Sequence, residues 1–176
     1  MYLLNRIIWS AKLSAMNLIA NIAKQIRELH FGGNWTDVNL KQTLTGVMWQ
    51  QAKTKVQDLN TIAALVFYIN YYTSAVLRVL EGAPLTSSNT FSFDLPPIQC
   101  NEDWENLKNK NWEDAEKFAN LVEQFPAGRL GDVFTHEKYE SYYKNIQGII
   151  EHIHYHLGQI VLIKKMVLQV PKDECM

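Results

Sequence analysis

Apolar residues recur at three- and four-residue steps along most of this chain, which is the spacing of amphipathic helices. No alternating pattern typical of a strand competes with that repeat. Residues 36–56 are less regular and predict two short helical turns around Leu40, Leu44 and Trp49. The four long helices are expected at about residues 3–29, 61–81, 101–125 and 137–170.

Capping and breaking residues set the expected helix ends. Asn60 is suited to cap the second helix, and Gly82 supplies a left-handed stop at its other end. Asn101 is the expected cap of the third helix, which Pro126 ends. Residues 83–100 contain three prolines and many Ser, Thr and Asn residues, so we expect a long connection there. Four helices with one long crossover predict an all-α four-helix bundle.

The apolar stripes identify the faces that should pack inward. The stripe of the second helix includes Leu65, Ile69 and Tyr72, and Tyr68 lies on the same side. The expected buried side of the fourth helix is Tyr143, Ile146, Ile149, Ile150, Ile153, Ile160, Ile163 and Val167.

Composition fits one globular domain spanning residues 1–176. The chain has a mass of 20.4 kDa, 47% hydrophobic residues and 20% charged residues, which is typical of a protein with a packed core. Its formal net charge of −1 provides no surplus of positive charge for a phosphate backbone, so nucleic acid is not an expected partner. Cys100 and Cys175 are too few for a disulfide framework, and a reducing cytoplasm is the expected compartment.

No membrane segment is predicted. Polar residues such as Asn5 and Arg6 interrupt the apolar N-terminus before it reaches the length of a signal-peptide core. No run of about 18 apolar residues occurs that would span a bilayer. The apolar face of residues 3–29 also fits an interfacial membrane helix, although the core stripe of a bundle explains it more simply. The glycosylation pattern at Asn34 is interpreted as chance.

The densest chemical feature is the segment Glu151–Gln159. His152 and His156 are four residues apart, so on a helix their imidazoles lie one turn apart on one face and can converge on one metal ion. At about 100° per residue, His154 points about 200° away from both. The face of the pair adjoins the apolar stripe of the fourth helix, which places the two imidazoles toward the bundle interior.

A metal site needs a further ligand from a facing helix. Tyr68 is the candidate that the pattern offers, although a phenol must lose its proton to bind strongly and its ordinary pKa is near 10. The alternative interpretation of Tyr68 is a core aromatic with a hydrogen-bonded hydroxyl. His30 and His136, at expected helix ends, are alternatives that fit solvated or capping roles better.

Other catalytic chemistry has little support in the sequence. Cys100 lies in the long connection, and no feature brings it beside a histidine. Glycine-rich phosphate loops, paired zinc cysteines and a serine nucleophile elbow are absent. Any chemistry is therefore expected to be metal chemistry.

The residues of several segments, taken together, resemble the DinB-like superfamily of metal-binding four-helix bundles over nearly the whole chain. The most specific block is the closing one, from Gly148 to His152 and from Tyr155 to Ile160. In that family two histidines of the closing helix are spaced as His152 and His156 are, and a third comes from the second helix, where this chain has Tyr68. The other matching segments are Asn60–Ala63, Ile69–Tyr72, Leu80–Gly82, Phe91–Asp94 and Asp103–Trp104.

The resemblance implies an up-down-down-up bundle, homodimers, and nickel or zinc bound by His152 and His156. Tyr68 would ligate in place of the usual histidine, weaken the site, or mark a lost metal. The activity implied is that of a thiol-dependent transferase using a low-molecular-weight thiol, or a metal-dependent hydrolase, in which the metal stabilises a thiolate or hydroxide. The rival hypothesis is a non-catalytic bundle with a degenerate metal site that binds a small apolar ligand or a protein partner.

Overall fold

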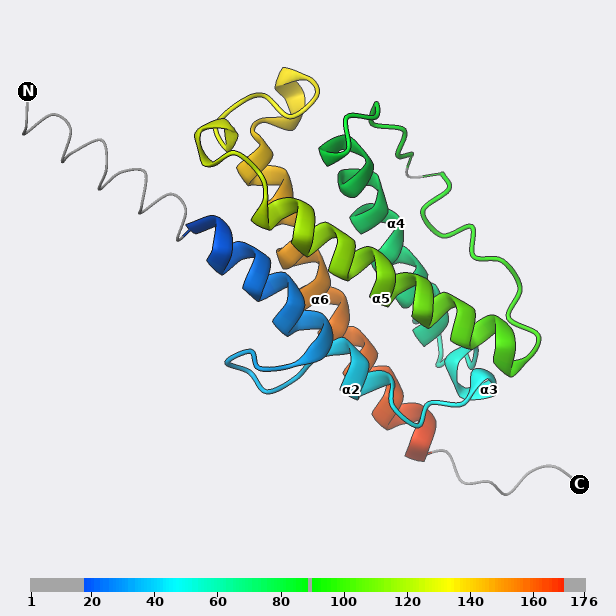
Figure 1. Cartoon of the computed structure of the whole chain (residues 1–176). Helices are drawn as coiled ribbons and strands as arrows, with labels where there is room; N and C mark the ends of the chain where they lie inside the picture. Colours follow the sequence, from blue (N-terminus) through cyan, green and yellow to red (C-terminus); the bar gives the residue numbers. More distant parts are fainter. Residues whose placement is uncertain (1–17, 89, 170–176) are drawn as a thin grey trace, which may run out of the picture.

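The computed structural model describes residues 18–88 and 90–169, and it is all-α (Figure 1). Within these residues there is no β-strand, and an isolated bridge joins Val133 to Ser141. The all-α class expected from the periodicity is therefore confirmed for the described residues. After an N-terminal helix at residues 18–31, the helices are α2 (Leu40–Leu44), α3 (Trp49–Ala52), α4 (Ile62–Leu80), α5 (Asn101–Glu123), the 3₁₀ turns Ala127–Arg129 and Glu137–Tyr139, and α6 (Tyr142–Gln169).

The N-terminal helix extends two residues further than the sequence predicts and then meets two glycines. Gly32 and Gly33 have φ values of +114° and +97°, a conformation that L side chains rarely adopt, so the helix ends there. The part of this helix expected at residues 3–17 lies outside the described residues. The inner side of the described helix, residues 18–31, packs into the core through Ile19, Ile22, Ala23, Ile26 and Leu29.

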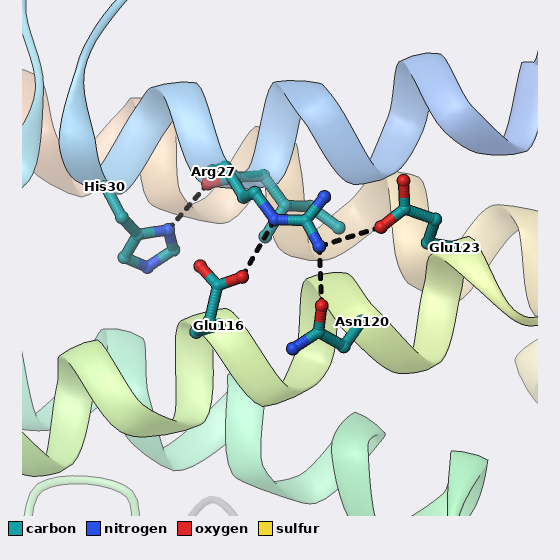
Figure 2. Close-up of polar contacts among 6 residues, drawn as sticks. Arg27, His30, Glu116, Asn120 and Glu123 are labelled. Atoms are coloured by element: carbon teal, nitrogen blue, oxygen red, sulfur yellow. Dashed lines mark hydrogen bonds and ion pairs between the residues drawn. The ribbon is translucent and has the colours of Figure 1, made fainter.

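A network of hydrogen bonds and ion pairs fastens the N-terminal helix to α5 (Figure 2). The Arg27 guanidinium donates to Glu116 at 2.9 Å, to Asn120 at 2.6 Å and to Glu123 at 2.8 Å. These three acceptors lie along one side of α5, so a single guanidinium bridges two turns of that helix. The hydrogen bond to Glu116 and the nearby carboxylates raise the pKa of Arg27.

The two short turns expected within residues 36–56 are present as α2 and α3. Asn39 caps α2, because its Oδ1 accepts from the backbone N–H of Gln42 at 2.9 Å. Lys164 of α6 donates to the carbonyls of Thr43 and Thr45, which closes the C-terminal end of α2 against α6.

The N-terminal caps of α4 and α5 each lie one residue away from the predicted cap. Thr61, rather than Asn60, caps α4, because its Oγ1 accepts from Ala64 N at 3.1 Å. Cys100 precedes α5 and Asn101 is its first residue. The expected connection between α4 and α5 is present, and it runs along the outside of the molecule (Figure 1).

α6 begins at Tyr142, five residues later than predicted. Glu140 has a φ of 59° and a ψ of −141°, so the backbone leaves the helical conformation immediately before α6. Ser141 Oγ then accepts from Lys144 N at 3.2 Å as the cap of the new helix. In the first turn of α6 it is Tyr142 that packs inward, against Phe125 and Phe134, so the adjacent Tyr143 is 42% exposed and the prediction that it is buried was wrong.

α4 lies against both α5 and α6, and its side chains form much of the core. Trp104 of α5 is fully buried and donates from Nε1 to the Val47 carbonyl at 2.9 Å. Between α4 and α5, the buried Asp114 carboxylate accepts from Asn70 and Ser74. α4 alone among the described helices is long and apolar enough to cross a membrane, but more than half of it is buried inside the protein, as in a core helix.

Candidate metal centre

The structure brings the two histidines of α6 together. Their ring centroids are 4.5 Å apart and the rings are nearly perpendicular, at 78°. His156 is buried and His152 is half-buried, whereas His154, which the helical spacing points away, is exposed. The two imidazoles therefore share one inward face of α6, one turn apart.

Tyr68 of α4 faces this pair. Its ring centroid lies 4.9 Å from that of His152 and 5.0 Å from that of His156. Tyr72, one turn further along α4, contacts both Tyr68 at 5.1 Å and His152 at 5.2 Å. Phe93, from the connection between α4 and α5, stacks on Tyr68 at 4.1 Å with the planes 14° apart. The resulting cluster of five rings is called the aromatic–histidine cluster below.

The hydrogen bonds of the two imidazoles differ. Nδ1 of His156 lies 2.6 Å from Oε1 of Gln159, one turn further along α6. With the amide oxygen as acceptor, the proton of His156 is held on Nδ1 and the lone pair on Nε2 is available to a ligand. In His152 both ring nitrogens are buried, and neither has a hydrogen-bond partner among the described residues. An imidazole buried in this way lacks a partner that a bound group would supply.

Both imidazoles are electrically neutral near neutral pH. Burial, followed by the proximity of His156, lowers the pKa of His152 to about 4. Burial also lowers the pKa of His156, and the hydrogen bond to Gln159 opposes that effect. A neutral imidazole has the lone pair that metal coordination requires.

The phenol of Tyr68 is held in its protonated form. Burial, and then a hydrogen bond with Tyr72, raises the pKa of Tyr68 above its ordinary value. Within residues 18–88 and 90–169, no three His, Cys, Asp or Glu side chains lie together as a metal-binding group. The donors at this place are therefore two imidazoles and one neutral phenol, which is one strong ligand fewer than the three protein ligands of a usual catalytic zinc site.

A groove of about 400 Å³ leads to the cluster from the surface. Tyr68, Tyr72 and His152 are among its half-buried lining residues. Its exposed lining residues include Lys138 and Glu140, from the segment before α6, and Lys144 from the first turn of α6. The side chain of His152 therefore lines this groove, while both of its ring nitrogens remain buried.

The alternative ligands lie elsewhere. The expectation that His30 is solvated or capping was wrong: it is fully buried, with Nδ1 2.8 Å from the Ile26 carbonyl of its own helix. The ring of His30 contacts Phe31, and the carboxylate of Glu116 acts on it electrostatically. Neither of these residues belongs to α6. His136 is a capping residue as expected, since its Nδ1 accepts from Lys138 N. Cys100 is exposed at the start of α5.

Three members of this neighbourhood were not singled out from the sequence as site residues. Tyr72 was assigned only to the core stripe, and its spacing of four from Tyr68 could have suggested a shared role. Gln159, three residues after His156, could have been identified as a partner for that imidazole by the same spacing. Phe93 carries no local signal, because its position depends on how the long connection returns past α4.

The chain matches no protein-family model, no curated protein and no solved structure. The functional argument therefore rests on the residues and geometry of the aromatic–histidine cluster.

Proposed function

We propose that this protein binds a divalent metal ion, nickel or zinc, through His152 and His156. The observation that supports the proposal most strongly is the state of His152, whose two ring nitrogens are both buried without a partner in the described structure. A buried polar group left in this way costs about 1–3 kcal/mol, and coordination at one nitrogen would offset part of that cost. The Nδ1 contact of His156 with Gln159 adds the outer partner that metal-bound histidines usually have.

Tyr68 is the third contact of the proposed site. Because its pKa is raised, its phenol acts as a neutral hydrogen-bond donor or weak ligand rather than as a phenolate. A bound divalent ion would supply Lewis acidity that favours a thiolate or hydroxide at neutral pH. The protein side chains would hold the ion through His152 and His156, orient the bound molecule through Tyr68, and limit water through Tyr72 and Phe93.

The reactions that suit this arrangement are thiol-dependent group transfer that uses a low-molecular-weight thiol, and metal-dependent hydrolysis, as the resemblance to DinB-like proteins implies. An up-down-down-up bundle is part of the proposal. The course of the helices in Figure 1 supports it, since the N-terminal helix and α6 begin at one end of the molecule and α4 and α5 begin at the other. We also propose that the protein is cytoplasmic and that it forms a homodimer. Three exposed apolar residues on α6, Tyr155, Leu162 and Met166, support the homodimer.

A non-catalytic bundle with a degenerate site is the second candidate. The raised pKa of Tyr68 and its stacking on Phe93 favour it, because both describe an aromatic that is satisfied without a metal. In that case the groove would bind a small apolar ligand or part of a protein partner.

Metal content distinguishes the two candidates. The purified chain should bind about one equivalent of Ni²⁺ or Zn²⁺, measured by elemental analysis and by titration calorimetry. The double variant His152→Ala, His156→Ala should lose that metal. A matched control, His154→Ala with His136→Ala, removes two exposed histidines and should retain it. Equal and negligible metal in the wild type and both double variants would refute metal binding.

Substitution of the tyrosine tests the third position. Tyr68→His places an imidazole opposite His152 and His156, so metal affinity should rise at least tenfold if the pair is competent and the phenol is a weak ligand. Tyr68→Phe keeps the ring and removes the hydroxyl, so it separates packing from coordination. If tight binding appears only in Tyr68→His, the natural chain has a degenerate site. If Tyr68→His binds no metal, the α6 pair is not a metal site.

A further inference from the structure

The groove that ends at His152 has an apolar floor and a charged rim. The floor is formed by Tyr72 and Val76 of α4 and by Ile149 of α6. The rim is formed by Lys138, Glu140 and Lys144. A ligand lying along this groove would have its apolar part between two helices and its polar end at the rim.

The charge of the rim is positive. Two ammonium groups, on Lys138 and Lys144, stand against one carboxylate, on Glu140. Lys138 Nζ lies over the ring of Tyr139 at 4.7 Å from its centroid. The Tyr139 ring also lines the groove, so it holds an ammonium group at the entrance.

Gly148 leaves the groove open on the side of α6. A Cβ built at Gly148 would meet no heavy atom within 4 Å outside its own helix backbone. The groove therefore extends over the position that any larger residue would fill. Gly158 of the same helix is equally open but lies outside the groove, on the exposed side.

We infer that this groove binds a small monocarboxylate with an apolar chain or ring, the carboxylate at Lys138 and Lys144 and the apolar part on Tyr72, Val76 and Ile149. This inference rests on the proposed function, because the inner end of the ligand would then meet the metal-binding face of His152. The volume of about 400 Å³ is that of a site for a small molecule rather than a polymer. The open Gly148 gives the ligand its passage, and the lysines select its charge.

The probes are 4-phenylbutyrate and its neutral amide, titrated into the full chain by calorimetry and by NMR. We expect the carboxylate to bind at least tenfold more tightly than the amide. The double variant Lys138→Gln, Lys144→Gln should remove that preference while leaving binding of the amide unchanged. A control variant, Lys41→Gln with Lys165→Gln, removes two lysines outside this groove and should retain the preference.

A second variant blocks the groove itself. Gly148→Phe should weaken both probes at least tenfold, whereas Gly158→Phe, on the same helix, should leave both unchanged. Equal binding of carboxylate and amide, or full binding to a folded Gly148→Phe protein, would overturn the inference. If Gly148→Phe does not fold, the double variant Lys138→Gln, Lys144→Gln decides instead. A preference for the carboxylate that this variant retains would overturn the inference.

Measurements with and without metal separate this inference from the proposed function. Each titration is repeated after chelation, because a carboxylate can also coordinate a metal directly. Carboxylate binding that persists after chelation and depends on Lys138 and Lys144 supports the groove even if metal binding has failed. Binding that disappears with chelation and ignores both lysines places the carboxylate on the metal and overturns the inference.

Discussion

The clearest prediction concerns His30, which lies in the N-terminal helix and is fully buried (Figure 2). Its Nδ1 is 2.8 Å from the Ile26 carbonyl, and its Nε2 has no hydrogen-bond partner in the described part of the chain. A proton added to this ring would therefore place a charge in the core. Burial is the largest effect, and it lowers the pKa of His30 from 6.5 to about 4 against the opposing influence of the Ile26 carbonyl and Glu116.

The direction of the pH effect on stability depends on whether the unfolded or the folded state binds the proton at the higher pH. As the pH falls below 6.5, His30 is protonated in the unfolded chain but remains neutral in the folded protein, so the free energy of unfolding decreases. The loss accumulates down to the folded pKa of about 4 and then stops. With these two pKa values, proton linkage gives a loss of about 2 kcal/mol at pH 5 relative to pH 7.5.

The assay is urea unfolding at pH 7.5 and pH 5, followed by circular dichroism, for the wild type and His30→Gln. Glutamine keeps a side-chain donor of similar length and cannot be protonated, so the stability difference between the two pH values should shrink by about 2 kcal/mol in this variant. His154→Gln removes an exposed histidine and is the matched control. Identical pH dependence of the wild type and His30→Gln would refute the reasoning.

Three further predictions use the same unfolding assay at pH 7.5. Asp114→Ala removes the acceptor of the buried Asn70 amide and the half-buried Ser74 hydroxyl and should cost about 3 kcal/mol, whereas the exposed neighbour Glu113→Ala should change stability by less than about 0.5 kcal/mol. Glu140→Gly should be about 1 kcal/mol more stable than Glu140→Ala, because only glycine adopts φ 59° with ψ −141° freely. Trp104→Phe loses the Nε1 donor to Val47 and should cost about 2 kcal/mol. For each of these predictions, a change in the free energy of unfolding of the opposite sign would contradict the reasoning.

The helices were largely predictable because their apolar faces repeat over many turns. Ile146, Ile153 and Ile160 are all fully buried, as the period of α6 indicates. The ends were less predictable, because they depend on single side chains. Asn60 and Thr61 are both good caps, and only the tertiary structure selects Thr61. The late start of α6 depends on Glu140, whose positive φ no residue pattern indicates.

The candidate site was also predictable only in part. The pairing of His152 and His156 follows from a spacing within one helix, and the structure places their rings 4.5 Å apart. The approach of Tyr68 required two helices to pack in the right rotation, which the inward stripe of α4 already indicated. The stacking of Phe93 could not be predicted, since a connection without periodicity can return along many paths.

Position 68 is therefore where the two candidate functions separate. α6 alone provides two neutral imidazoles, and the amide oxygen of Gln159 holds the proton of His156 on Nδ1. In the proposed metal site, the residue that α4 places at position 68 would set the affinity, because a phenol with a raised pKa loses its proton to a metal less readily than an ordinary phenol does. Tyr72 contributes to that effect through its hydrogen bond. Tyr72→Phe should therefore strengthen metal binding at a site with Tyr68 intact, and it should have no such effect once Tyr68 is phenylalanine.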